Sequence, residues 1–325
     1  MSKTIGSLVC GLFLIAFSIA QPAWAQRGNE RIKISYTATA MSLLPLFFGV
    51  DQKVYEGEGF QVDLVRISGG NIIPSALLNR ELDYTSSANF SLFAGLPIRT
   101  IGAMQIKTPL SLVVRPEIKT GADLKGKSIA IARPGSLTDN IAREFARHYG
   151  LNPDRGEITT LGLGDHSARI IALQTNRVQA AILDAPSDIQ IQSQGYRILA
   201  YSSDLLPETL QNGLSTSLAK IQEQRPQAKR VLRAFVKSQM LTVKRPDLVI
   251  PFVMRFWKID KPTAEQSYRH LVKTFTRDGT PSKESVANAV AFAVQVTKGT
   301  RSISAEDVFA PELLDEVHQE LGLRK

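Results

Sequence analysis

Apolar and polar positions alternate along the chain in short stretches that are separated by helical ones. Residues 31–36 and 60–65 place apolar side chains at every second position, the pattern of a half-exposed strand, and 82–84 predicts a third, shorter strand. The stretches 43–55 and 71–80 between them have helical patterns. Because parallel strands need a crossover connection, this β-α-β-α-β order predicts a mainly parallel sheet flanked by helices.

A second unit with the same alternation follows. It begins after the apolar stretch 110–114, and its predicted strands cover 128–132, 157–161, 178–183 and 196–201, with helices over 137–149 and 166–174. Residues 212–217 predict a returning strand, and the remainder of the chain is helical in pattern. We therefore expect an α/β protein with two lobes and a helical C-terminal tail. Lobe I covers 30–114 plus 212–325 and is discontinuous, and lobe II covers 115–211.

The first 25 residues are predicted to be a cleavable signal peptide. Lys3 precedes an uncharged apolar run over 5–20, and Ala23-Trp24-Ala25 supplies the small residues of a cleavage site. The run is short for a membrane-spanning anchor. Cleavage after Ala25 predicts a periplasmic protein, and it lowers the net charge from +9 to +8 because Lys3 is the only charged residue removed.

Composition excludes several kinds of chemistry. A chain of 325 residues favours about two domains. Its single cysteine, Cys10, lies in the predicted signal peptide, and the four histidines are not at metal-motif spacing, so we expect no cofactor and no metal site. Lysine and arginine are scattered and are not interleaved with aromatic residues, which argues against a nucleic-acid partner.

Five short motifs, in their order and spacing, resemble the periplasmic substrate-binding proteins of ABC importers. The group concerned includes binders of nitrate, sulfonates, taurine and thiamine-pyrimidine precursors. The motifs are 122–127 (ADLKGK), 44–49 (LPLFFG), 55–60 (YEGEGF), 78–83 (LNRELD) and 173–180 (LQTNRVQA). Two positions depart from the pattern: Arg80 stands where glycine is usual, and Gln179 where aspartate is usual.

The resemblance implies two α/β lobes of the type II periplasmic-binding-protein kind, which hold a small polar organic solute between them. It also implies transient docking of a monomer to a membrane permease. A sulfonate, a carboxylate and a pyrimidine-like compound all remain possible solutes. Since lobe closure follows only from contacts that a ligand makes better in the closed state, the solute must touch both lobes.

Candidate binding residues lie at the junctions that follow strands, because ligands of open parallel sheets bind beyond the carboxyl ends of the strands. In lobe I they are Thr37, Thr39, Ser42, Gly69, Gly70, Asn71, Ser86 and Ser87. In lobe II they are Gly135, Ser136, Thr138, Asp165, His166 and Asp184. Ser136 and Thr138 have an alternative interpretation as helix caps. Asp184 either binds an amine or pyrimidine-like nitrogen or caps the following turn, so the charge of the solute stays open.

Two other functions are weighed against solute transport. Asp165-His166-Ser167 is not a catalytic triad, because neighbouring residues do not easily converge side chain to side chain, and no G-x-S-x-G motif is present. A pyrimidine-precursor synthase with this fold relies on a cysteine-rich motif, which this chain lacks. We therefore expect no enzyme. A periplasmic ligand sensor that feeds a signalling partner would have the same fold and the same site, so it remains an alternative.

Overall fold

The computed structural model describes residues 29–67, 72–88, 93–210 and 212–323. The predicted signal peptide and three candidate residues, Gly69, Gly70 and Asn71, lie outside these ranges. Within them, no helix has the length and apolar character needed to cross a membrane.

The first sheet has five strands in the order β2-β1-β3-β10-β4. Its strands are β1 (Glu30–Tyr36), β2 (Phe60–Arg66), β3 (Tyr84–Ser87), β4 (Ile98–Gln105) and β10 (Asn212–Ser217). β1 is parallel to β2 and β3, whereas β10 runs antiparallel to β3 and β4. Four strands therefore point one way and β10 returns between them, which agrees with the mainly parallel sheet that the alternation predicts.

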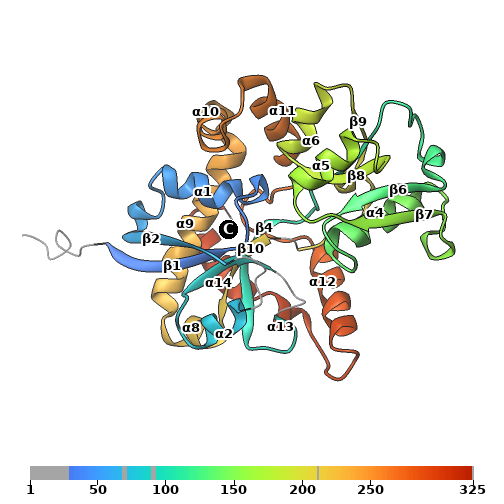
Figure 1. The fold of residues 1–325 in the computed structure, drawn as a ribbon. Helices are drawn as coiled ribbons and strands as arrows, with labels where there is room; N and C mark the ends of the chain where they lie inside the picture. Colours follow the sequence, from blue (N-terminus) through green and yellow to red (C-terminus); the bar gives the residue numbers. More distant parts are fainter. Residues whose placement is uncertain (1–28, 68–71, 89–92, 211, 324–325) are drawn as a thin grey trace, which may run out of the picture.

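The second sheet repeats this plan in the order β7-β6-β8-β5-β9. Its strands are β5 (Leu110–Val114), β6 (Lys127–Ile131), β7 (Ile158–Gly162), β8 (Ala180–Asp184) and β9 (Arg197–Tyr201). β6 is parallel to β7 and β8, and β5 runs antiparallel to β8 and β9. Figure 1 shows the two sheets as two lobes side by side.

Helices cover both sheets. Those between strands are α1 (Leu44–Asp51), α2 (Ile73–Leu78), α4 (Leu137–His148), α5 (His166–Gln174), α6 (Ser187–Gln192) and α7 (Ser202–Leu205). The tail contains α8 (Leu218–Glu223), α9 (Arg225–Lys244), α10 (Pro246–Trp257), α11 (Lys261–Leu271), α12 (Lys283–Val296), α13 (Ala305–Val308) and α14 (Pro311–Glu320). α9 and α14 both contact β4, so the tail builds on the first sheet.

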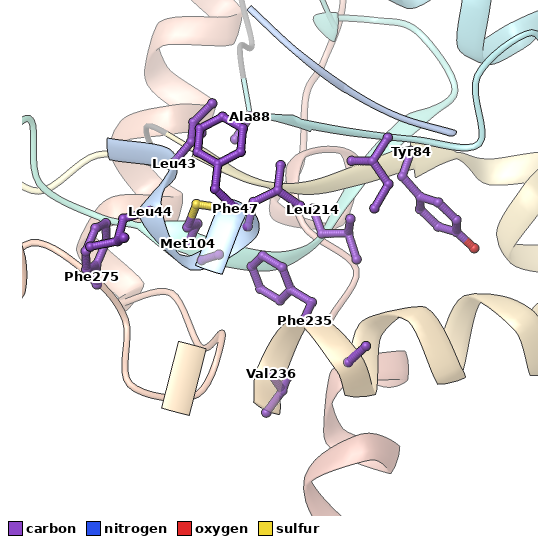
Figure 2. Close-up of a cluster of buried hydrophobic side chains, with 14 of the residues drawn as sticks. Leu43, Leu44, Phe47, Tyr84, Ala88, Met104, Leu214, Phe235, Val236 and Phe275 are labelled. Carbon is purple, nitrogen blue, oxygen red and sulfur yellow. The ribbon is translucent and has the colours of Figure 1, made fainter. Parts of the chain in front are cut away.

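One large apolar core joins the first sheet to this tail, and two smaller cores cover the two faces of the second sheet. In the large core, Phe235 and Val236 of α9 are buried near Leu214 of β10 and Met104 of β4 (Figure 2). Burial of this kind stabilises a fold by about 25 cal/mol per Å² of apolar surface. The tail is therefore held by the hydrophobic effect.

The observed strand pairing places the boundary between the lobes at a different point of the chain from the predicted one. β5 was expected in lobe I, but its residues pair with β8 and β9, so the chain first crosses between the sheets over 106–109. It returns between Tyr201 and Asn212. β5 has no alternation because all its residues are buried, so its pattern does not indicate which sheet it joins.

The strand β4 was not predicted. Its buried positions include the polar residues Thr100 and Gln105, which interrupt the apolar pattern of this edge strand. A Cβ atom at Gly102 would lie 2.8 Å from the Phe235 ring, so this glycine allows α9 to approach the strand closely.

Candidate functional site

The carboxyl ends of the parallel strands carry the candidate residues. In the first sheet, β1 ends at Tyr36 and β3 at Ser87. In the second sheet, β6, β7 and β8 end at Ile131, Gly162 and Asp184. Since this is the edge at which open α/β sheets bind ligands, the loops that follow these strands form the candidate site.

The loop after β1 presents polar groups to solvent. Thr37 and Thr39 are exposed, and Ser42 is half-buried. The indole N–H of Trp257, at the end of α10, donates to the backbone carbonyl of Thr39 at 3.2 Å. The far C-terminal tail thus holds this loop in place.

The end of β3 is fixed by its neighbour β10. The Ser215 hydroxyl donates to the backbone carbonyl of Ser87 at 2.8 Å, and the Ser87 N–H donates to Thr85 Oγ1 at 3.3 Å. Ser86 is buried and Ser87 is half-buried. Ser87, the less buried of the two, is therefore the better candidate for contact with a solute.

The loop between β6 and α4 is held by its own hydrogen bonds. Thr138 Oγ1 accepts from the Ala132 N–H at 2.9 Å and lies 2.8 Å from Ser136 Oγ. The Gly135 N–H donates to the buried Asp139 carboxylate at 2.8 Å. Ser136 occupies the N-cap position of α4 but makes no side-chain cap hydrogen bond. Gly135 has a φ of 72° and open space at its Cβ position, which leaves its backbone accessible.

α5 brings two candidate residues to the end of β8. Asp165 caps this helix, since its Oδ1 accepts from the Ala168 N–H at 2.9 Å. His166 Nε2 is paired with Asp184 Oδ1 across the two elements. Ser167 is exposed, and the histidine faces Asp184 and not Asp165, so the three adjacent residues form no relay.

Arg169 lies directly behind this pair. The residue is 3% exposed, and its guanidinium donates to the backbone carbonyls of Asp165 (3.2 Å) and Ile182. Burial lowers the pKa of Arg169, and the charges of Asp184 and Asp165 oppose that shift. The Arg169 guanidinium therefore offsets part of the negative charge of Asp184 and Asp165.

Two contacts join the lobes near this edge. The Tyr201 ring, at the end of β9, stacks on His270 of α11 with centroids 3.6 Å apart. Gln266 of α11 donates to Gln192 of α6 at 2.9 Å. Burial lowers the pKa of His270 to about 4, with Asp204 opposing the shift and Lys273 adding to it. The neutral imidazole is thus the form that this contact favours.

Sequence reasoning missed three residues here. Arg169 was hidden because a charged residue within a helix is ordinarily solvated, and His270 because α11 is far from β9 in the chain. Trp257 was not among the candidate residues, yet its indole N–H donates to the Thr39 carbonyl. The end of a helical tail gives no signal that it reaches a loop more than 200 residues earlier.

Surface hollows among the described residues do not coincide with this edge. Two hollows, of about 240 and 190 Å³, are lined by residues such as Arg99 with Arg301 and Arg80 with Lys220, and neither includes a candidate residue. In the part of the chain that the structure describes, no group of three or more His, Cys, Asp or Glu side chains is arranged to hold a metal ion.

Two mixed sheets joined by two crossings, with polar loops at the carboxyl ends of their strands, define the fold of a periplasmic binding protein. The chain belongs to the NMT1/THI5-like family, whose model matches residues 41–248. No curated protein sequence matches the chain significantly.

Solved structures support the fold assignment. The periplasmic sulfonate-binding protein SsuA from Methylobacillus flagellatus KT superposes with a TM-score of 0.72 at 15% identity, over 92% of this chain and 97% of that one. The periplasmic aliphatic sulphonate-binding protein SsuA from Escherichia coli gives 0.67 at 19%, over 86% and 92%. The desulfurization enzyme DszB also shares the fold, with 0.65 at 12%, over 90% and 99%.

Proposed function

We propose that the protein is the solute-binding component of an ABC importer, which captures a small polar organic solute between its two lobes. A sulfonate, a carboxylate or a pyrimidine-like compound fits the proposal. The observation that carries it is the position of polar loops at the carboxyl ends of the parallel strands in both sheets. The two lobes that contain these sheets are connected by two chain crossings.

Both lobes would contribute polar groups that recognise the solute. Lobe I offers the hydroxyl groups of Thr37 and Thr39 and the end of β3, and lobe II offers the Gly135 backbone and the His166–Asp184 pair. An anionic group can accept from the exposed hydroxyl groups of Thr37 and Thr39, whereas an amine can donate to Asp184. The proposed solute therefore contains a polar head that bridges the lobes.

The proposal extends to location and partners. The predicted signal peptide supports a periplasmic protein, and sulfonate-binding SsuA, which shares the fold, is itself described as periplasmic. Delivery to a membrane permease follows if the lobes close on the solute and present a new combined surface. We propose a monomer that docks transiently.

An enzymatic role is the alternative that one comparison raises, because DszB shares the fold. One DszB structure is of a variant with a cysteine replaced by serine, in complex with biphenyl-2-sulfinic acid. In this chain the only cysteine is Cys10, within the predicted signal peptide. The mature chain would have no thiol, which favours binding without turnover.

A thermal-shift screen tests the proposal. The panel contains sulfonates, aromatic carboxylates, amines and pyrimidines, added to the mature protein at a large excess. A binder at 100 times its Kd stabilises the folded state by about 2.7 kcal/mol, so a clear rise in Tm is expected. No shift with any compound contradicts solute binding, and chromatographic conversion of a bound compound contradicts the non-enzymatic role.

A further inference from the structure

Four aromatic side chains gather where α10 meets α1. This aromatic wall consists of Phe47, Phe252, Phe256 and Trp257. Phe256 lies at its centre: its ring stacks on Phe47 and on Phe252 with centroids 5.1 Å apart, and it lies 4.6 Å from the Trp257 ring.

The wall is buried on one side and open on the other. Phe47 and Phe252 belong to the large core, whereas Phe256 is 41% exposed and Trp257 is partly exposed. Packing alone would bury the central ring of such a cluster, because an aromatic side chain gains most from full burial. The exposed face of Phe256 is therefore a surface available for contact.

The wall adjoins the loop after β1. Trp257 donates to the Thr39 carbonyl at 3.2 Å, and Tyr36, the last residue of β1, meets Phe47 edge to face at 5.2 Å. The exposed hydroxyl groups of Thr37 and Thr39 thus lie beside an aromatic surface. In the other lobe, Leu137, the first residue of α4, is 47% exposed after the end of β6.

We infer that the aromatic wall is the apolar part of the proposed solute site, and that the solute has a planar aromatic ring next to its polar head. This inference rests on the proposed function. The ring would stack on Phe256 and Trp257 while the head meets the polar loops. Trp257 acts in addition as a positioning residue, because its N–H holds the carbonyl of Thr39.

Tryptophan fluorescence gives a direct measurement. The chain has two tryptophans, and Trp24 lies in the predicted signal peptide, so Trp257 is the single tryptophan of the mature protein. Matched probes are benzenesulfonate against methanesulfonate, and benzoate against acetate. We expect the aromatic member of a pair to change Trp257 emission saturably and to bind more tightly than its aliphatic partner.

Variants separate stacking from folding. Phe256→Leu keeps an apolar side chain but removes the ring, and it should weaken binding of the aromatic probe about threefold to tenfold, the effect of one lost aromatic pair. The matched control is Phe292→Leu on α12, which replaces a phenylalanine that is 43% exposed outside the wall. Binding by the control should equal that of the wild type.

The outcomes distinguish the two proposals. Equal affinity for the aromatic and aliphatic members of each pair, or unchanged aromatic binding by Phe256→Leu, overturns the inference and leaves solute binding intact. No binding of any probe, in a protein whose Tm also fails to rise across the wider panel, overturns the proposed function itself.

Discussion

At the scale of single residues, Asp188 is the most unusual group of the second lobe. It is fully buried, and one of its carboxylate oxygens has no hydrogen-bond partner. Burial raises its pKa to about 7, although Ser111 and the Ile189 N–H oppose the shift, and the charge of Asp184 adds to it. The native state therefore favours a protonated carboxyl, whereas the unfolded state has the ordinary pKa of about 3.8.

This difference makes stability depend on pH. A raised native pKa contributes stability that is fully present below pH 3.8 and is lost as the pH rises through 7. Asp188→Asn removes the ionisation, so we expect a gain of about 1–3 kcal/mol in the free energy of unfolding at pH 8 relative to the wild type, and little difference at pH 4. Urea denaturation followed by circular dichroism measures both values. Asp63→Asn, on the more exposed β2, is the control, and an equal gain in both variants would contradict the account.

At the scale of elements, the same turn ends a helix in each lobe. Arg80 follows α2 with a φ of 62°, and Asn176 follows α5 with a φ of 59°. Residues other than glycine are strained in this left-handed region, asparagine less than most. The usual glycine of the family motif thus has a conformational reason, and the sequence departs from it at a strained position.

Arg80→Gly tests this strain. The substitution relieves the left-handed backbone and removes the exposed ion pair with Glu223, which contributes little in solvent. We expect the free energy of unfolding to rise by about 0.5–1 kcal/mol. Asn176→Gly should change it less. A loss of stability in Arg80→Gly, measured by urea denaturation, would show that the ion pair with Glu223 stabilises the fold by more than the backbone strain destabilises it.

The pattern of buried and exposed residues in each strand explains which strands could be predicted from the sequence. The half-exposed strand β1, where buried Ile32 and Ile34 alternate with exposed Arg31 and Lys33, was visible in the sequence. Fully buried β5 could not be assigned to a sheet, and β4 was missed because Thr100 and Gln105 are buried in it. Alternation reports only strands that have one wet face.

The candidate site could likewise be predicted only in part, because the sequence shows only its local features. Strand ends are local features, so the loops with Thr37, Gly135 and His166 could be proposed from the sequence. The pairing of His166 with Asp184 and the hydrogen bond from Trp257 to Thr39 join distant segments, and no local pattern indicates them. Which of these residues contact a solute stays a prediction.

At the scale of the whole molecule, the contact between Tyr201 and His270 links the two lobes. If this contact belongs to the closed arrangement, the neutral imidazole supports closure, because burial holds its pKa near 4 against an ordinary 6.5. A lowered pKa contributes stability that is present above pH 6.5 and is lost as the pH falls towards 4. We therefore expect solute affinity to fall between pH 7 and pH 5.

His270→Ala removes both the stacking and this titration. Its affinity at pH 7 should be about twofold to tenfold weaker than that of the wild type, and nearly constant down to pH 5. His148→Ala, an exposed histidine of the second lobe, should keep the wild-type profile. Isothermal titration at several pH values measures the profiles, and an unchanged profile in His270→Ala would remove this contact from the account of closure.

We infer that one solute is held between two lobes that close on it. Small-angle X-ray scattering of the mature protein, with and without the compound that gives the largest rise in Tm, measures this closure. We expect a smaller radius of gyration that saturates at one solute per chain, with the compound recovered unchanged. A radius of gyration that stays the same while the solute is demonstrably bound would contradict closure of the lobes.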